Sequence, residues 1–247
     1  MEENGKEILI KIEHVSMTYR MTAQKVDNLK EFVIRFLKRK LKYKKHEVLD
    51  DVSFNIYRGE SVAIVGKNGA GKSTLLRIVA GIIPPTSGKV SVYGSMVPML
   101  NIGSGFDYNA SGKENVFLNG AIMGYTRKEM EAKYDEIVEF SELGEFMDTP
   151  IKNYSSGMTA RLGFAIAVNS KPDIIIVDEV LAVGDAKFHL KCNEKMKQLQ
   201  REGVTFVIVS HSRSAVEMLC DRAVYIKDRK IAIDGDIESV YAMYDND

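Results

Sequence analysis

The stretch Gly66-Lys67-Asn68-Gly69-Ala70-Gly71-Lys72-Ser73-Thr74 fits the pattern G-x-x-x-x-G-K-[ST] at every fixed position. Glycines let the backbone curl so that successive N–H groups point at one anion. Lys72 adds a cation, and the hydroxyl of Ser73 can bind magnesium. The pattern therefore predicts a loop that binds phosphate groups, and we call residues 66–74 the phosphate loop.

The residues on both sides of the phosphate loop support this interpretation. Residues 61–65 are a short apolar run typical of a buried parallel strand, and residues 75–80 continue as a helix that Gly81 ends. Strand, loop and helix thus follow in the order that the motif requires. The alternative, a glycine-rich turn with a chance lysine, does not account for both neighbours.

Length and composition limit the kind of protein. A chain of 247 residues with 45% apolar composition can bury a full core, as one large domain or two small lobes. No apolar run approaches the ~18 residues that a membrane helix needs. The start is polar and acidic, without the features of a secretory signal, so we expect a cytosolic protein. Cys192 and Cys220 are expected to be free, reduced and packed inside.

Positive charge is concentrated in one segment, although the formal net charge is zero. Residues 25–46 hold nine lysines and arginines against two acids, a net charge of +7. Apolar residues recur there at helical spacing and predict a basic amphipathic helix: Leu29, Val33, Phe36, Leu37 and Leu41. Two interpretations stay open. The helix packs its apolar stripe on its own domain, or it lies near a membrane surface or a membrane partner.

The other patterns predict strands and helices in alternation. The expected elements are half-buried strands at 8–12 and 52–56, a turn at 84–88, a strand at 89–93, a helical region from Gly112 with a capping box at 126–129, a helix from about 154 to 168, a helix at 186–202, a strand at 204–209, a hairpin through 227–230 and a short C-terminal helix.

Carboxylates follow a second buried strand. Residues 174–177 are four apolar residues that lead directly to Asp178 and Glu179. In a chain with a phosphate loop, this order suggests that Asp178 binds magnesium and that Glu179 activates water. The alternative is a surface loop that happens to carry two acids. His211 follows the strand at 204–209, and the C-terminal ends of parallel strands meet at one crevice, so we expect it to be catalytic.

Together these motifs resemble the ATPase subunits of ABC transporters over nearly all of the chain. The resemblance implies an α/β fold, with a P-loop NTPase (RecA-like) core, an antiparallel β subdomain and an inserted α-helical subdomain at about residues 100–170. It implies one nucleotide-binding domain over residues 1–247. In this family a Ser-Gly-Gly signature grips the γ-phosphate of ATP held by the facing subunit. Ser155 and Gly157 match that signature, whereas Ser156 and Met158 depart from its common form.

Several stretches are similar to the ATPases that export O-antigen polysaccharide or teichoic acid. They are Tyr154-Ser155-Ser156-Gly157-Met158, Gly103-Ser104-Gly105-Phe106, Gly112-Lys113-Glu114-Asn115-Val116 and Asp178-Glu179-Val180-Leu181-Ala182-Val183-Gly184-Asp185. Those exporters also carry an N-terminal insertion, which matches residues 22–46. The O-antigen type often has a carbohydrate-recognising domain after the ATPase. Because this sequence stops at Asp247, either the substrate is not recognised in that way or the protein is truncated.

The resemblance also assigns roles by position. Glu179 and His211 would be catalytic, and Ser73 and Asp178 would bind Mg²⁺. Asn101 stands in the loop that usually supplies a glutamine, so either Asn101 takes that place or the contact is absent. The residues expected to bind ATP are Tyr19 (on adenine), Gly66, Asn68, Gly69, Ala70, Gly71, Lys72, Ser73, Thr74, Ser155, Ser156, Gly157 and Asp185 (across the dimer). The other histidines, His14, His46 and His189, are expected to be structural.

The function implied is that of an ATP-hydrolysing exporter subunit at the cytoplasmic face of the membrane. Its partners would be a second ATPase subunit, joined on ATP binding, and an integral membrane permease that handles a lipid-linked glycopolymer; nucleic acid is not expected. One alternative is an ABC ATPase for another exported substrate. A second is a soluble ABC ATPase acting on ribosomes or nucleic acid, and a third is a protein that binds ATP without turnover.

Overall fold

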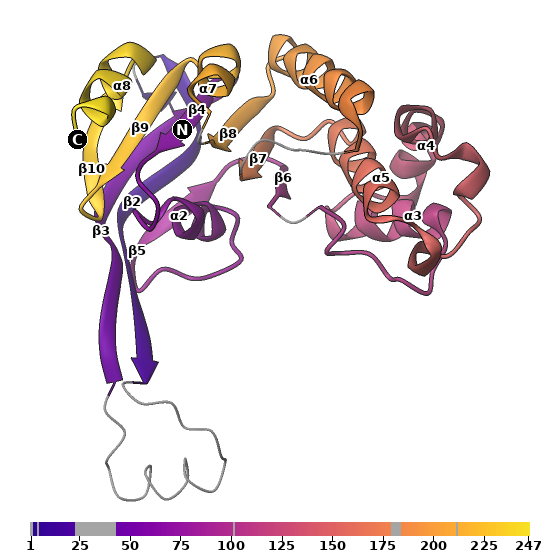
Figure 1. Ribbon diagram of the computed structural model, residues 1–247, viewed down its shortest axis with the longest axis horizontal. Coiled ribbons are helices and arrows are strands. Elements are labelled where there is room, and N and C mark those ends of the chain that lie inside the picture. Colours follow the sequence, from indigo (N-terminus) through magenta and orange to yellow (C-terminus); the bar gives the residue numbers. More distant parts are fainter. Residues whose placement is uncertain (1, 4, 23–42, 101, 179–183, 211) are drawn as a thin grey trace, which may run out of the picture.

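The computed structural model describes residues 2–3, 5–22, 43–100, 102–178, 184–210 and 212–247. These residues form two β-sheets with helices on both sides, and a helical unit stands at one end (Figure 1). The sequence predictions that lie outside the described residues are the amphipathic helix through residues 29–41 and the site residues Asn101, Glu179 and His211.

A six-stranded sheet forms the centre of the molecule, in the order β10-β9-β4-β8-β7-β6. Its strands are β4 (Ser61–Val65), β6 (Met96–Met99), β7 (Ile174–Asp178), β8 (Thr205–Val209), β9 (Arg222–Lys227) and β10 (Lys230–Gly235). All neighbours run parallel except β9 and β10, which form the predicted hairpin. The carboxyl ends of the parallel strands therefore meet along one edge, as expected for a sheet that carries its site there.

The central sheet is buried on both faces, which explains its continuous apolar strands. In β7, Ile175 and Val177 pack into one core, whereas Ile174 and Ile176 pack into a second core on the opposite face. The alternation follows from the two-residue period of a strand. The first core includes residues of α6 (Ala186–Arg201), α7 (Arg213–Leu219) and α8 (Ile237–Asp245), and the second includes residues of α2 (Lys72–Val79).

An antiparallel sheet covers the second core. It consists of β1 (Glu2–Glu3), β2 (Lys6–Thr22), β3 (Tyr43–Tyr57) and β5 (Ser87–Val92), with β2 between β3 and β5. The predicted strands at 8–12 and 52–56 are thus confirmed, but both are longer. Residue 22 and residues 43–46, which we assigned to the insertion, are strand, because β2 and β3 continue to pair as far as Thr22 and Tyr43.

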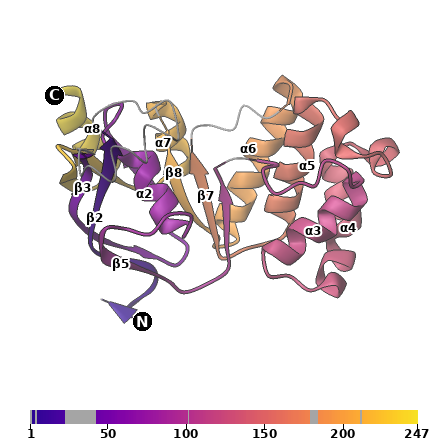
Figure 2. The same ribbon diagram turned by 90° about the horizontal axis from the view of Figure 1, so that it is seen from below.

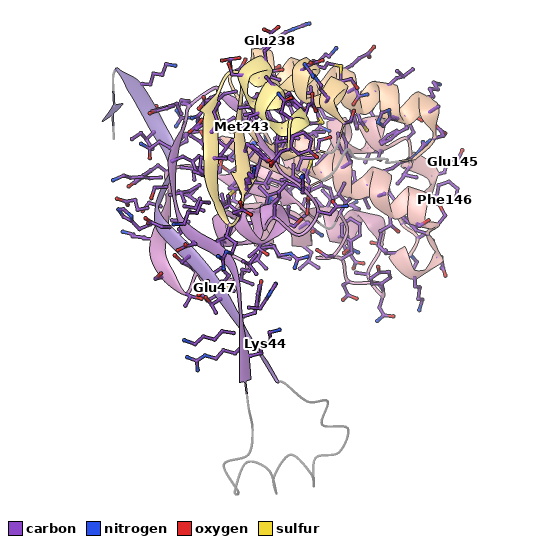
Figure 3. All side chains as sticks on the ribbon, turned by 60° about the vertical axis from the view of Figure 1, so that its left-hand side comes forward. Lys44, Glu47, Glu145, Phe146, Glu238 and Met243 are labelled. Atoms are coloured by element: carbon purple, nitrogen blue, oxygen red, sulfur yellow. The ribbon has the colours of Figure 1, made fainter. Side chains whose placement is uncertain are left out.

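The outer part of β2 and β3 is a two-stranded ribbon that projects away from the body (Figure 1). In Figure 3, Lys44 lies on this projecting part and Glu47 lies closer to the body. Arg20 and Lys45 are directly opposite each other on the two strands. Like charges at paired positions repel. Because both side chains are exposed, the outer part of β2 and β3, residues 18–22 and 43–47, forms an exposed basic ribbon.

The helical unit is built from α3 (Gly112–Ile122), α4 (Arg127–Ser141) and α5 (Ser156–Asn169), with short 3-10 turns at Gly144–Phe146 and Ile151–Asn153. The predicted capping box at Thr126 and Glu129 is confirmed, and Ser111 with Glu114 forms another. Figure 2 shows the three helices together at the end of the molecule opposite α2. They share a core of their own around Phe106, Val116, Met130, Ile137 and Leu162.

The elements that were not predicted from the sequence include β1, β6, α7 and the two 3-10 turns. β6 contains Pro98 and pairs only with β7, so it is an edge strand of the sheet, where a proline is tolerated. α7 has only 7 residues, too few to show a helical period.

Cys192 and Cys220 are free and buried, as predicted. Burial raises the pKa of each thiol to about 12, so both stay protonated near neutral pH. No helix within the described ranges is long and apolar enough to span a bilayer.

Candidate functional site

The phosphate loop connects β4 to α2, as its sequence predicts. Gly69 and Gly71 both have left-handed backbone angles, with φ of +82° and +102°. A Cβ on Gly71 would lie 2.8 Å from the carbonyl oxygen of Val48 and 2.8 Å from a methyl group of Leu49. Glycine is therefore required at this position by both conformation and space. Because Gly71 is the N-cap of α2 and has no side chain, the helix N-terminus, with its positive dipole end, is open to an anion.

Lys72 is folded back over the phosphate loop. Its side-chain amine donates hydrogen bonds to the carbonyl oxygens of Gly66, at 2.6 Å, and Lys67, at 3.0 Å. The residue is 6% exposed. A buried lysine needs such partners, and they hold the cation beside the N-terminus of α2, where phosphate oxygens would bind.

A cleft of about 760 Å³ opens next to the phosphate loop. The predicted residues that line it are Tyr19, Asn68, Gly69, Gly71, Lys72, Ser73, Thr74 and Asp178. Gly66 and Ala70 complete the same loop without lining the cleft. Asp178 is the last residue of β7 and is partly buried. The structure thus brings the hydroxyl of Ser73 and the carboxylate of Asp178 to one cleft, and both are oxygen donors of the kind that Mg²⁺ prefers.

Four residues that sequence reasoning did not assign to the site also line this cleft: His46, Val48, Leu100 and Val209. His46, which we expected to be structural, thus lies at the wall of this cleft. It is paired directly with Tyr19 across β2 and β3, which places the two side chains on the same face of the ribbon. Only the pairing register could have revealed this, and the intervening insertion hides that register in the sequence.

A second cleft, of about 610 Å³, lies between α5 and the start of α6. It is lined by Ser155, Ser156, Gly157, Met158, Ala160, Arg161, Gly184 and Asp185. It therefore collects the remaining predicted ATP-binding residues. No described residue lines both clefts. In Figure 1, α5 stands in the helical unit at the other end of the molecule from α2, and α6 lies between that unit and the central sheet.

Helix caps fix the residues of the second cleft. The hydroxyl of Ser155 is the N-cap of α5 and accepts a hydrogen bond from the backbone N–H of Met158, at 3.2 Å. The carboxylate of Asp185 caps α6 by accepting from the N–H of Phe188, at 2.9 Å. This hydrogen bond, followed by the charge of Arg161, lowers the pKa of Asp185 from its ordinary value. The cleft thus presents a helix N-terminus beside an ionised carboxylate.

A glycine loop between strand and helix, with a buried lysine and a serine hydroxyl at the helix start, defines a P-loop nucleotide-binding domain. Comparisons with known proteins identify its family. The family model described as ABC transporter matches residues 49–182. An O-antigen export system ATP-binding protein of Klebsiella pneumoniae, RfbB, is 42% identical over 96% of this chain and 97% of its own length. The chain belongs to the ABC transporter family, and it is the ATPase domain of that family.

Another relative and two solved structures agree with this assignment. The teichoic acids export ATP-binding protein TagH of Enterococcus faecalis is 39% identical over 97% of this chain, which spans 53% of that protein. A structure of the ATP-binding subunit of an ABC transporter has a TM-score of 0.76 at 21% identity, and covers 96% of this chain and 93% of its own. A dimeric bacterial ABC transporter cassette has a TM-score of 0.70 at 24% identity, over 93% and 99%. The predicted fold class, with its core and two subdomains, is confirmed.

Proposed function

We propose that two copies of this chain close face to face around ATP, and that hydrolysis drives export of a lipid-linked polysaccharide or teichoic acid through a membrane permease. One observation supports the dimer above all. Each cleft holds part of a nucleotide site, one with a phosphate loop and one with a helix N-terminus, and the two share no described residue. A second copy, related by a two-fold axis, would bring each cleft against the other.

In this proposal, each ATP lies between the first cleft of one subunit and the second cleft of the other. The phosphate loop and Lys72 bind the β- and γ-phosphates, while Tyr19 and His46 flank the base. The N-terminus of α5 in the facing subunit, at Ser155, donates its N–H groups to the γ-phosphate. Ser73 and Asp178 would hold magnesium, which spreads the negative charge of the phosphates.

We assign the role of proton acceptor in hydrolysis to Glu179, which follows β7 directly in the sequence. Its carboxylate would take a proton from the attacking water as the water's oxygen bonds to the γ-phosphorus and the bond to the β–γ bridging oxygen breaks. His211, after β8, would orient the same water or phosphate. Both assignments rest on sequence position and on the shared edge of β7 and β8.

The exported substrate is proposed from the relatives, because the names of both the RfbB and the TagH relatives specify export of a surface polymer. The decisive experiment purifies the chain with its membrane subunit and measures ATPase activity and transport of a lipid-linked glycopolymer in vesicles. Transport of another substrate in place of the polymer would refute the polymer assignment. Activity that requires ribosomes or DNA would favour the soluble-ATPase alternative.

We also propose that the basic segment 22–46 faces the membrane or the permease. The support comes from its charge of +7 and from the exposed basic ribbon that leads to it. Each lysine or arginine near anionic lipid contributes about 1 kcal/mol. Replacing Phe36 and Leu37 with Ser should then impair export while ATP binding stays unchanged. If these changes unfold the subunit, the stripe is core packing; if they change nothing, the segment has neither role.

A further inference from the structure

Arg161 lines the second cleft and contacts three residues outside α5, which are Asp185, Glu142 and Phe188. It lies on α5, six residues after Ser155, and its side chain is 18% exposed. One guanidinium nitrogen donates to the carboxylate of Asp185, at 2.7 Å, and another donates to Glu142, at 3.1 Å. The guanidinium also lies over the ring of Phe188, 4.6 Å from its centre. Because the guanidinium group is planar and donates in fixed directions, it holds the carboxylates of Asp185 and Glu142 in place relative to α5.

The two carboxylate oxygens of Asp185 have different partners. Oδ1 accepts from the N–H of Phe188 and so caps α6, whereas Oδ2 accepts from Arg161. The cap alone would hold one oxygen and leave the carboxylate free to turn. With Arg161 in place, the orientation of the carboxylate is set by α5, the helix whose N-terminus forms the signature.

Glu142 is the second carboxylate that Arg161 binds. It is the C-cap of α4 and adopts a left-handed conformation, with φ of +59°, which is uncommon outside glycine. Its second oxygen accepts from Lys191 of α6, at 3.0 Å. Helices commonly end on a left-handed residue, and here the carboxylate of that residue joins α5 to α6 through Arg161 and Lys191.

We infer that Arg161 is a positioning residue, which locks Asp185 and the N-terminus of α5 into one preformed surface for the nucleotide of the facing subunit. The inference rests on the dimer in our proposed function. Because the guanidinium of Arg161 is engaged by Asp185 and Glu142, we assign it no contact with the reacting atoms. Its loss would therefore leave ATP binding by the phosphate loop unchanged, and it would weaken closure of the two subunits.

The test compares Arg161→Gln and Arg161→Lys with a control, Arg127→Gln, whose arginine is 79% exposed and contacts Glu131 of α4 and the ring of Phe117 of α3, neither of which lines the second cleft. All are made in chains that also carry Glu179→Gln, to prevent turnover. We expect an unchanged Kd for ATP and a dimerisation constant weakened roughly 10- to 100-fold for Arg161→Gln, less for Arg161→Lys, and not for the control. In the monomer, amide exchange at residues 184–188 should be faster in Arg161→Gln.

The same substitution in a chain that carries Asp185→Ser distinguishes loss of the Arg161–Asp185 contact from a general loss of stability. Asp185→Ser keeps a helix cap but has no carboxylate for Arg161 to hold. Adding Arg161→Gln to Asp185→Ser should therefore weaken dimerisation much less than it does alone. Equal effects in both backgrounds, or normal dimerisation of a folded Arg161→Gln chain, would overturn the inference. If Arg161→Gln does not fold, the same comparison is made with Arg161→Lys. If the wild-type chain never dimerises with ATP, the proposed function fails, and the exchange measurement alone decides whether Arg161 holds Asp185.

Discussion

Exchanging Ser155 for Asp or for Asn separates the two roles that the structure gives this residue. Its hydroxyl caps α5, and in our proposal the same helix start faces a γ-phosphate. Asp and Asn cap helices about as well as Ser, and they have nearly the same size. Both variants should therefore fold with a stability close to that of the wild type. They differ by one negative charge, placed where the phosphate of the facing subunit would bind.

The size of the effect follows from Coulomb's law. Two like charges about 4 Å apart repel by about 4 kcal/mol at an effective dielectric constant of ~20. Each 1.4 kcal/mol corresponds to a factor of ten, so Ser155→Asp should weaken ATP-driven dimerisation, relative to Ser155→Asn, by roughly 10²- to 10³-fold for each of the two sites. Ser155 is exposed in the single chain and lines the second cleft only. Binding of ATP to the phosphate loop of the monomer should therefore be equal in both variants.

Sedimentation equilibrium with ATP, in chains that also carry Glu179→Gln, measures the dimer, and a fluorescent ATP analogue measures binding to the monomer. The difference between the variants should shrink as salt is raised, because ions screen exposed charges. Equal dimerisation of Ser155→Asp and Ser155→Asn, with both folded, would refute the idea that α5 faces a phosphate.

Three further predictions follow from the same structure. Lys72→Ala should weaken ATP binding roughly 10- to 100-fold in a fluorescence titration, because it removes a charged hydrogen-bond donor; unchanged affinity would contradict the role of the phosphate loop. Glu179→Gln should lower the rate of ATP turnover by roughly 10²- to 10⁴-fold while ATP still binds. A rate of phosphate release equal to that of the wild type would refute the role of Glu179 as the proton acceptor. Arg58 donates to Glu7 and Asp173 and lowers the pKa of both carboxyls from their ordinary values of 4.5 and 3.8; the stability gained is present above those ordinary values and is lost as the pH falls through the lowered ones. The thermal midpoint should thus fall as the pH drops below the ordinary values, and it should fall less steeply in Arg58→Gln.

Three strands of the central sheet, β4, β7 and β8, were predictable because each is an almost continuous apolar run. The sequence after the first of them also predicted the phosphate loop between strand and helix. The capping box at 126–129 was equally local, since both partners lie within four residues. Local features of this kind depend little on the rest of the fold.

Features that depend on pairing between distant residues were missed. The full length of β2 and β3 was not visible in the sequence. Their outer parts, residues 18–22 and 43–47, are mostly polar or charged and pair with each other rather than packing on a core. His46 lines the cleft next to the phosphate loop because the register places it opposite Tyr19. The link from Arg161 to Asp185 joins residues that are 24 positions apart, and no local pattern connects them.

The separation of the two clefts has a consequence for genetic complementation. In a two-fold dimer, each composite site takes its phosphate loop from one chain and its helix N-terminus from the other. A chain with Lys72→Ala and a chain with Ser155→Asp, expressed together, would place both defects in one site of the mixed dimer and leave the other site intact. A chain that carries both changes, paired with a wild-type chain, would spoil both sites. Two individually inactive alleles would therefore rescue each other, whereas the same two lesions on one allele would be dominant.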